Sequence, residues 1–579
     1  MKYFCISAFL QFVLLSCFAQ NDSTINLLYE KYSKAYENMD VAGLSQLFTE
    51  DATAINLYQH ETPNSIKGNI NIGNYYKQFF QRNSSANNKL RLLFKIAERK
   101  HNGNAIYDNG FYALEISNNE NPKQSYFGKF STVIHVVNSE CKFFIDATST
   151  AGFTEFENTD ALIIPATDYY LYPDFYDKLL GTYITIDKKL LTIGRSQGRL
   201  YAYYPGTGLY RGLKKINATT WTAGEKIISD SAVATYRFIE SSDGYKVEVS
   251  QQGKQPITAI RSDYYTTKKG FYKNSSGIKL GSTIFFPKKP NGKAIVLVHG
   301  SNAQDRNGYA SIIRILADVL ARNGTTVLTY DKQGVGSSSG NWEGESFEQL
   351  AEDALAGINY LKSNKQFKFS KIGLGGSSQA GWIIAKAVEK NPAIDFVLTI
   401  GAAGSGVSVI EQNLYNTRVL MECQNFNSAQ IATALKQQNL FYAFLQHASD
   451  GKELDNFTKE ISKDSLVSDW LYPVTTGIDF KNKNQWYTAL EIGYDPLAAW
   501  KQYNKPALML FSEFDDSTPT TVVIKNLEAL NKKNINIKLL PKSQHIGLLT
   551  NGVCNAEIAN LDKFHPNFFQ VMINWINAL

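Results

Sequence analysis

Residues 371–382, with the sequence KIGLGGSSQAGW, constrain this chain more than any other stretch, because a short apolar run turns there sharply into a predicted helix. A serine held at such a turn needs very small residues two positions before and after it, since larger side chains would collide. With Ser378 at the turn, those neighbours are Gly376 and Ala380. With Ser377 the second neighbour would be a bulky glutamine. The sequence therefore favours Ser378 as the residue at the turn.

Three further apolar runs are followed by polar groups that could work with this serine. Residues 293–298 are a continuous apolar run that ends in His-Gly-Ser301, a turn that can aim a backbone N–H at a developing negative charge. Asp515 follows the apolar run that starts at Ala507, and His545 follows a later one. Serine, aspartate and histidine in this order along the chain are typical of a nucleophile, acid and base on a strand-helix alternation.

Residues 270–579 resemble the α/β-hydrolase superfamily, in particular its esterase and serine-aminopeptidase-like branch. The turn at Ser378, the turn after residue 298 and the order of Asp515 and His545 are three matches. The fourth is the sequence DKQGVGSS from Asp331, which resembles the D-x-x-G-x-G-x-S loop of that family, with glutamine at 333 where arginine is common.

The resemblance implies a catalytic domain over residues 268–579 with a doubly wound, mostly parallel sheet. The strand after the turn helix, residues 396–400, is followed by about a hundred residues before the next strand. That is longer than a simple crossover connection, so we expect a helical lid over about 403–495.

The chemistry of these groups predicts a role for each. A serine hydroxyl is a poor nucleophile at neutral pH, so His545 would take the proton of Ser378 while Asp515 holds the imidazole tautomer. The backbone N–H groups of Ser301 and Gln379 are the expected oxyanion hole.

The favoured function is hydrolysis of carboxylic esters, small-molecule ester or acyl compounds, through an acyl-enzyme intermediate. Amide or peptide cleavage is the alternative, because the same triad can perform it. A different class of function is a small-ligand-binding protein in which the hydrolase-like region is an inactive scaffold, and a complete triad argues against it. No cofactor and no metal are expected.

Residues 1–19 predict a secretory signal peptide, with one basic residue, an apolar stretch and Ala19 before the expected cleavage site. The sequence around Cys17 also loosely fits a lipoprotein site, which would tether the chain through a lipid. No other stretch is long enough to cross a bilayer. We therefore expect an exported protein, periplasmic or secreted, without an integral membrane span.

The cysteines and the charged residues show which kinds of binding site the sequence does not indicate. The three cysteines left after cleavage, Cys141, Cys423 and Cys554, are widely spaced and show no metal-ligand spacing. An oxidising compartment permits one disulfide, but buried thiols are the favoured interpretation. The net charge of +6 is small for 579 residues and the basic residues are scattered, so no nucleic-acid surface is indicated.

Residues 22–157 predict an α+β domain. Two helices are expected between residues 25 and 48 and a third near 72–80, followed by alternating strands. This order of elements suggests a strongly curved antiparallel sheet packed on helices, an α+β cone.

The cone resembles the family of nuclear transport factor two and ketosteroid isomerase. That resemblance implies a pocket between sheet and helices. Catalysis, binding of a small apolar ligand and a merely filled pocket are the three alternatives for it. Asp51 and His135 could line the pocket, although structural roles are the favoured interpretation for both.

Residues 165–265 predict a small antiparallel β-barrel or sandwich, because short apolar runs recur at regular spacing between Gly, Asp and Ser turns. The rhythm resembles β-domains that accompany some secreted hydrolases. Its many tyrosines are expected to pack rather than to form a binding surface.

Overall fold

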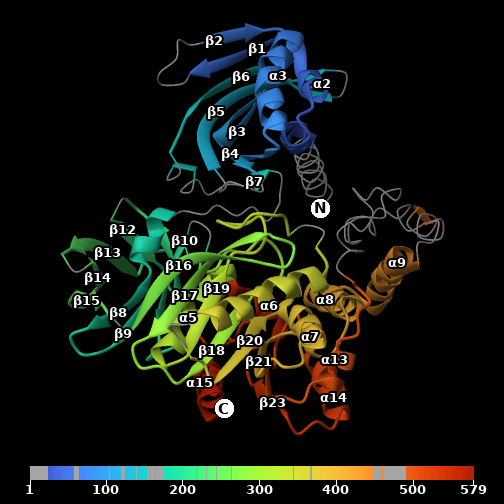
Figure 1. Ribbon diagram of the computed structural model, residues 1–579. Helices are drawn as coiled ribbons and strands as arrows, with labels where there is room; N and C mark the ends of the chain where they lie inside the picture. Colours follow the sequence, from blue (N-terminus) through green and yellow to red (C-terminus); the bar gives the residue numbers. More distant parts are fainter. Residues whose placement is uncertain are drawn as a thin grey trace, which may run out of the picture. The chain divides into compact units, whose positions relative to one another are not determined.

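The computed structural model divides into two compact units, Met1–Leu171 and Tyr172–Leu579, which are described separately (Figure 1). Between residue 447 and residue 491 it describes only 456, 459 and 460, and it describes 24–447 and 491–579 except for 58–63, 103–104, 119–123, 138–139, 153–154, 157–162, 165–173, 197–198, 218, 230, 243, 263, 343–344 and 365–367. The predicted signal peptide, Cys17 and most of the second half of the predicted lid lie outside the described residues.

The first unit packs helices on one seven-stranded sheet. The sheet has the order β2-β1-β6-β5-β4-β3-β7, in which only β1 and β6 pair in parallel. Besides a helix over 24–37, its elements are α2 (Val41–Gln46), β1 (Phe48–Leu57), β2 (Asn64–Lys67), α3 (Asn69–Ser85), β3 (Lys89–Asn102), β4 (Ala105–Ser117), β5 (Gln124–Val137), β6 (Glu140–Thr150) and β7 (Ile163–Ile164).

The second helix is shorter than the sequence predicted. Helix α2 ends at Gln46, and Phe48 is the first residue of β1 rather than the last of the helix. From Ala52 to Asn56 buried and half-buried residues alternate, and this two-residue period fixes the segment as a strand. The observed architecture is α+β, while the cone family remains a prediction.

The second unit begins with a closed barrel of eight antiparallel strands, in the order β10-β11-β12-β13-β14-β15-β8-β9. Of the two predicted forms, barrel and sandwich, the barrel is confirmed. Closure removes the free edges that short strands would otherwise expose. The strands are β8 (Gly181–Thr185), β9 (Leu190–Ser196), β10 (Arg199–Tyr204), β11 (Leu209–Lys215), β12 (Thr220–Ala223), β13 (Ala234–Ser241), β14 (Gly244–Gln251) and β15 (Ile257–Arg261).

An eight-stranded sheet forms the rest of this unit, in the order β16-β17-β19-β18-β20-β21-β22-β23. Its first two strands are antiparallel to their neighbours, and all later pairs are parallel. The strands are β16 (Tyr265–Lys273), β17 (Lys279–Pro287), β18 (Lys293–Val298), β19 (Thr326–Tyr330), β20 (Lys371–Ser377), β21 (Phe396–Ile400), β22 (Ala507–Ser512) and β23 (Ile535–Leu540). The mostly parallel sheet predicted for this region is confirmed.

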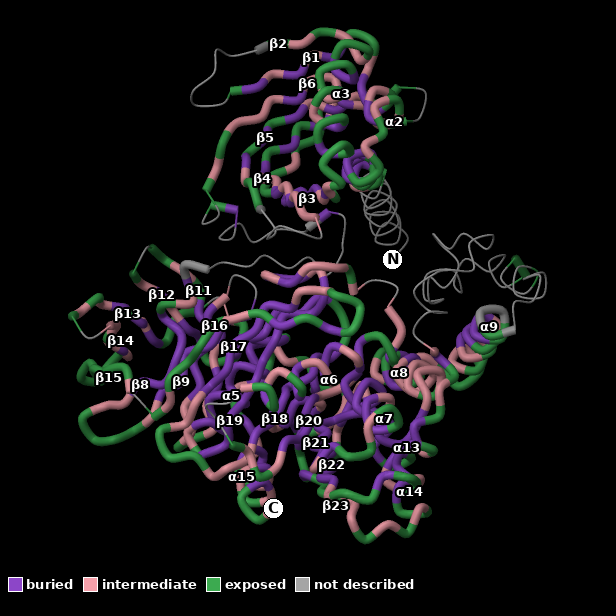
Figure 2. The backbone as a smooth tube through the Cα atoms, in the orientation of Figure 1, coloured by how far each residue is buried: buried purple, intermediate pink, exposed green. Residues whose placement is uncertain are grey.

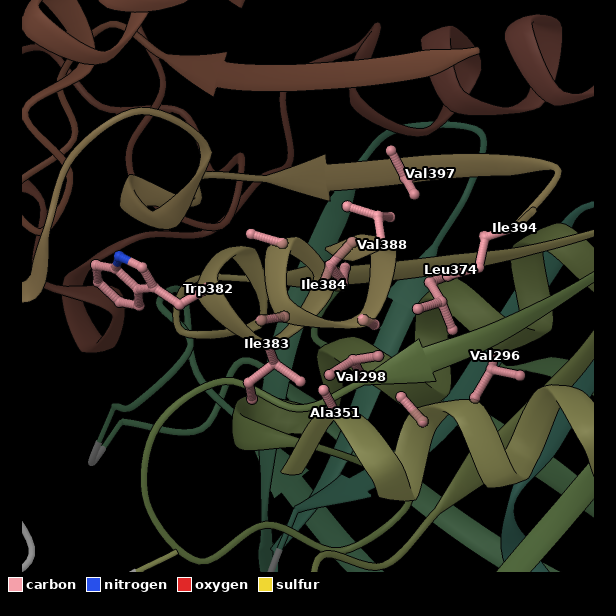
Figure 3. Close-up of a cluster of buried hydrophobic side chains, with 14 of the residues drawn as sticks. Val296, Val298, Ala351, Leu374, Trp382, Ile383, Ile384, Val388, Ile394 and Val397 are labelled. Carbon is pink, nitrogen blue, oxygen red and sulfur yellow. The ribbon is translucent and has the colours of Figure 1, made fainter. Parts of the chain in front are cut away.

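Helices cover both faces of this sheet, so its central strands are buried on two sides (Figure 2). One face packs on α5 (Ile312–Arg322) and α15 (Phe568–Ala578), and the other on α6 (Phe347–Ser363), α7 (Ala380–Lys390), α13 (Leu497–Gln502) and α14 (Thr520–Ala529). Figure 3 shows part of the core between the sheet and α6 and α7, where Ile384 of α7 lies near Leu374 of β20. The predicted capping box of Ser346 and Gln349 starts α6.

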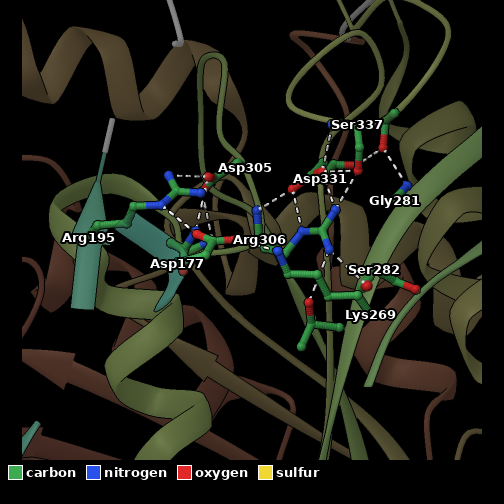
Figure 4. Close-up of polar contacts among 12 residues, drawn as sticks. Asp177, Arg195, Lys269, Gly281, Ser282, Asp305, Arg306, Asp331 and Ser337 are labelled. Carbon is green, nitrogen blue, oxygen red and sulfur yellow. Dashed lines mark hydrogen bonds and ion pairs between the residues drawn. The ribbon is translucent and has the colours of Figure 1, made fainter. Parts of the chain in front are cut away.

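The barrel and the sheet share one hydrophobic cluster. Tyr201, Tyr203 and Tyr210 of the barrel belong to the same cluster as α5 and α15. Polar pairs reinforce this packing: Arg195 of β9 donates to Asp305 at 2.8 Å, with both side chains fully buried (Figure 4). The regions that the sequence predicted as separate domains, 165–265 and 268–579, are thus joined through a continuous core.

This shared core predicts how truncated chains behave. Residues 172–579 should melt cooperatively, whereas residues 268–579 should aggregate or lack a cooperative transition. The shorter chain lacks Tyr201, Tyr203 and Tyr210, so the apolar side chains of α5 and α15 in the same cluster become exposed, and Asp305 loses its ion pair with Arg195. Differential scanning calorimetry of both chains checks this. Cooperative melting of 268–579 near the temperature of the longer chain would contradict the expectation.

Candidate functional site

Ser378 lies on a strained turn between β20 and α7. Its φ is +58°, a left-handed backbone conformation that costs energy for a residue other than glycine. The turn is held because the Ser378 N–H donates to the Ile400 carbonyl of the neighbouring strand at 3.0 Å. A methyl group added to Gly376 would lie 2.5 Å from the Cβ of Ala380 and 2.6 Å from the Val298 carbonyl. The predicted need for small residues on both sides of the turn is therefore met in three dimensions.

Asp515 and His545 form a hydrogen-bonded pair at the ends of β22 and β23. The His545 Nδ1 lies 2.9 Å from Oδ1 and 3.0 Å from Oδ2 of Asp515, whose side chain is fully buried. Oδ1 also accepts the backbone N–H groups of Ser517 at 2.9 Å and Thr518 at 2.7 Å. These bonds fix the carboxylate, so it can orient the imidazole with Nε2 free for a proton.

The contact with Asp515 changes the pKa of His545. Burial opposes a charged imidazole, but the negative charge and hydrogen bond of Asp515 outweigh it, and Asp516 adds to them, so the pKa of His545 is raised. A raised pKa makes the imidazole a stronger base than an ordinary histidine.

The three residues gather at one edge because the carboxyl ends of parallel strands meet there. Gly401 follows the Ile400 carbonyl that binds Ser378, and a methyl group added to Gly401 would lie 3.3 Å from both Asp515 Oδ2 and His545 Nδ1. The Ser378 hydroxyl makes no hydrogen bond with His545 among the described residues. Such bonds are often long in unliganded hydrolases and shorten when substrate binds.

The two predicted oxyanion donors flank this serine. Gln379 follows Ser378 as the N-cap of α7 and is buried, while Ser301 is exposed on the turn after β18. Within the described part of the chain, neither backbone N–H has a hydrogen-bond partner. Gly300, beside Ser301, is close to the nucleophile, because a methyl group on it would lie 3.5 Å from the Ser378 Cβ.

Asp516 follows the acid Asp515 directly and is not a fully exposed turn residue. It is half-buried, and burial raises the pKa of its carboxyl; the charge on Asp515 also raises it and the nearby His545 lowers it. Within the described residues, the one side chain that hydrogen-bonds to its carboxylate is Ser517, whose hydroxyl donates at 3.1 Å. Asp516 therefore influences the histidine through charge but does not bind it.

The favoured interpretation of the cysteines as buried thiols is wrong for two of them. Cys423 and Cys554 form a disulfide across 131 residues. It joins the end of α8 (Val409–Cys423), the first helix of the predicted lid, to the loop that follows His545. Closing so long a loop stabilises a folded chain by about 2–4 kcal/mol. Cys141 is a free, half-buried thiol.

Helix α8 also contacts the loop that carries the acid. The Tyr415 hydroxyl donates to the Asp515 carbonyl at 2.6 Å, and Gln412 Nε2 donates to the Ser517 carbonyl at 2.8 Å. The start of the predicted lid is therefore anchored beside the triad candidates. The next helix, α9 (Ser428–His447), continues this region, and a lid over Ser378 remains a prediction.

The first unit contains a cavity of about 360 Å³. Asp51 and His135 are not among the residues that line it, in agreement with the structural roles favoured for both. The carboxyl that lines it is Asp146, buried beside the Tyr32 hydroxyl at 3.3 Å, and burial raises its pKa to about 6. Half of the lining residues are aromatic: Tyr32, Tyr36, Tyr75, Tyr76, Phe79, Phe94, Tyr112 and Phe130.

Metal-binding clusters and membrane-spanning helices are both absent from the described residues. No group of three or more His, Cys, Asp or Glu side chains there is arranged to hold a metal ion. No helix among these residues has the length and apolar character needed to span a membrane.

Comparison with known protein families finds a match for part of the second unit. Residues 289–549 match the family model described as Serine aminopeptidase, S33. This match and the doubly wound sheet place the region in the α/β-hydrolase superfamily, as the sequence predicted. A comparison with curated protein sequences finds no match.

Several solved structures are similar to parts of the chain. The Pyrococcus furiosus esterase Pf2001 is 16% identical with a TM-score of 0.32, over 49% of this chain and 83% of that one. Est1E from Butyrivibrio proteoclasticus, with ferulic acid bound, is 15% identical with a TM-score of 0.32, over 53% and 97%. The α/β hydrolase GrgF from Penicillium sp. sh18 is 18% identical with a TM-score of 0.32, over 48% and 91%.

Proposed function

We propose that this protein is an exported serine hydrolase that cleaves carboxylic esters through an acyl-enzyme intermediate. Ser378 is the nucleophile, His545 the general base and Asp515 the residue that orients the histidine. The observation that carries the proposal is the buried Asp515–His545 pair at the sheet edge that also presents Ser378 on a left-handed turn. Serine hydrolases of this fold need that combination of a strained nucleophile and an oriented imidazole.

The steps follow from these groups. His545 Nε2 takes the hydroxyl proton as the Ser378 oxygen bonds to the ester carbon, and the N–H groups of Ser301 and Gln379 stabilise the resulting oxyanion. The imidazolium then protonates the departing alcohol, which leaves an acyl-serine. Water, deprotonated by the same histidine, releases the acid and restores the serine.

Ester and amide cleavage share this chemistry, so amide or peptide hydrolysis remains the second candidate, in line with the serine aminopeptidase description of the matching family model. The leaving group decides between them. A fluorophosphonate probe should label the purified protein, and a panel of acyl esters and aminoacyl amides then gives kcat/KM for each class. Absence of labelling, with no turnover of either class, contradicts the proposal.

The disulfide supports the export part of the proposal. Disulfides persist in oxidising compartments and are rare in the cytosol. The Cys423–Cys554 bond therefore agrees with the signal peptide predicted over residues 1–19. A periplasmic or secreted location, with or without a lipid on Cys17, follows from both features.

A binding function is proposed for the first unit alongside the hydrolase. Its cavity combines an aromatic wall with one buried carboxyl, Asp146, and such pockets suit small, largely apolar ligands. Binding by this unit does not require an inactive hydrolase. Isothermal titration of the wild-type protein and of Asp146→Leu with the hydrolysis products tests whether this cavity takes them up.

The pH dependence of the reaction should follow His545. Only the neutral imidazole can accept the serine proton, so kcat/KM falls as the pH drops below the pKa of His545. Because that pKa is raised, the acid limb should lie above about 6.5, the ordinary value for histidine. Asp516→Asn removes a charge that contributes to the shift, so the limb should move to lower pH. A limb below 6.5 in the wild-type protein, measured with a neutral ester, contradicts this.

A further inference from the structure

Lys332 is a buried lysine behind the turn that carries Ser301. It follows β19, and only 2% of the residue is exposed. Its Nζ donates to the carbonyl oxygens of Gly300 and Asn302, both at 2.7 Å. Its backbone N–H donates to the Gln304 carbonyl at 3.1 Å. One side chain thus holds the two peptide carbonyls on either side of Ser301.

Because the peptide bond is planar, this contact also determines where the Ser301 N–H points. The Gly300 carbonyl and the Ser301 N–H belong to the same peptide plane, and in a trans peptide they point in opposite directions. An ammonium group that fixes the Gly300 oxygen therefore aims the Ser301 N–H away from Lys332. A methyl group added to Gly300 would lie 3.5 Å from the Ser378 Cβ, so this turn lies close to the nucleophile.

One further contact holds this turn, and one of its residues has a strained backbone. Gln304 Nε2 donates to the Ser301 carbonyl at 2.6 Å, so three successive carbonyls are bound by two side chains. Asn302 has a φ of +67°, a left-handed conformation that persists only when its surroundings hold it. The turn would therefore rearrange readily if the lysine contacts were lost.

The positive charge on Lys332 also affects how strongly the Ser301 N–H donates a hydrogen bond. Hydrogen bonds from a charged donor are stronger than neutral ones, and a chain of bonds polarises the groups along it. An ammonium on the carbonyl oxygen of a peptide draws electron density from its N–H, which makes that N–H a better donor to an oxyanion. In a buried setting this effect is larger than in water.

We propose that Lys332 is a positioning residue that aims and polarises the Ser301 N–H toward the oxyanion. The inference rests on the proposed function, since it assigns a role within the same reaction. Lys332 does not contact substrate in this role. It acts through the Gly300–Ser301 peptide, and its Nζ also donates to Gln379 Oε1 at 3.5 Å.

The test compares transition-state and ground-state binding in Lys332→Met. The Ser378 oxygen adds to the carbonyl carbon of a trifluoromethyl ketone, the hydroxyl proton passes to His545, and the ketone oxygen becomes the oxyanion. In Lys332→Met the affinity for this ketone and kcat/KM should fall in parallel by about a hundredfold, the effect of losing one oxyanion donor. KM should stay within about threefold, and the acid limb of the pH profile should not move.

Lys371→Met is the matched control. Its Nζ also donates to a backbone carbonyl, that of Leu579 at 2.6 Å, but Lys371 begins β20 at the end opposite Ser378. The ketone affinity of this variant should stay within about threefold of wild type.

Two failures are distinguishable. If Ser378→Ala keeps wild-type activity, the proposed function is wrong. If Ser378→Ala is inactive while Lys332→Met keeps its ketone affinity, or loses activity only through KM, the proposed function stands and the role of Lys332 is overturned. Where Lys332→Met does not melt cooperatively, Lys332→Gln takes its place. If neither variant folds, the lysine supports the fold and the positioning role is overturned.

Discussion

Replacing Ser378 by alanine is expected to lower kcat by at least about a thousandfold and to abolish fluorophosphonate labelling, because members of a catalytic triad act as a unit. The substitution removes only the hydroxyl, and the smaller alanine fits the same turn. The measurement is kcat on a simple ester, together with the melting temperature, which should stay close to that of the wild-type protein.

Ser377→Ala is the matched control for this prediction. Ser377 is the last residue of β20 and pairs with Ile400 of β21, so it belongs to the strand and precedes the turn. We expect this variant to keep activity within about tenfold of the wild-type value. An inactive Ser377→Ala together with an active Ser378→Ala would show that the nucleophile is Ser377.

Sequence reasoning succeeded where one local pattern decided the structure. The apolar runs that became β18 and β21 are continuous because central parallel strands are buried on both faces, and the observed bounds are those predicted. The turn at Ser378 was predictable for a similar reason, since its steric demand falls on residues only two positions away.

Sequence reasoning failed where the decisive partner is distant in the chain. Cys423 and Cys554 are separated by 131 residues, and their pairing depends on the approach of α8 to the loop after His545. Arg195 and Asp305 are 110 residues apart and belong to regions with different strand rhythms. No periodicity or spacing within either region could have indicated that these residues meet.

The buried position of Asp146 in the cavity of the first unit could not be predicted for a different reason. Asp146 follows the apolar residues 143–145, and a charged residue after such a run is a common sign that a strand ends. The strand β6 continues to Thr150 and turns Asp146 inward, beside Tyr32. A buried carboxyl inside a strand looks the same in sequence as an exposed one at its end.

The largest remaining effect is expected at the acid, where Asp515 and Asp516 are adjacent and only one binds the histidine. Asp515→Asn should lower kcat by up to about 10⁴-fold, because an amide at this position favours the wrong histidine tautomer, as it does in serine proteases. The structural reason is specific to Asp515, whose Oδ1 lies 2.9 Å from His545 Nδ1 and is fixed by two backbone N–H groups.

Asp516→Asn provides the comparison on the same loop. Asp516 makes no hydrogen bond to His545 among the described residues and acts on it only through charge, so on the pH plateau, where the imidazole is already neutral, kcat should change by well under tenfold. Both variants keep the size of the side chain, which limits differences in folding. Measuring kcat for both on one ester decides the assignment: equal losses, or a larger loss in Asp516→Asn, would show that Asp515 is not the orienting acid, because only the residue that fixes the imidazole tautomer can have the larger effect.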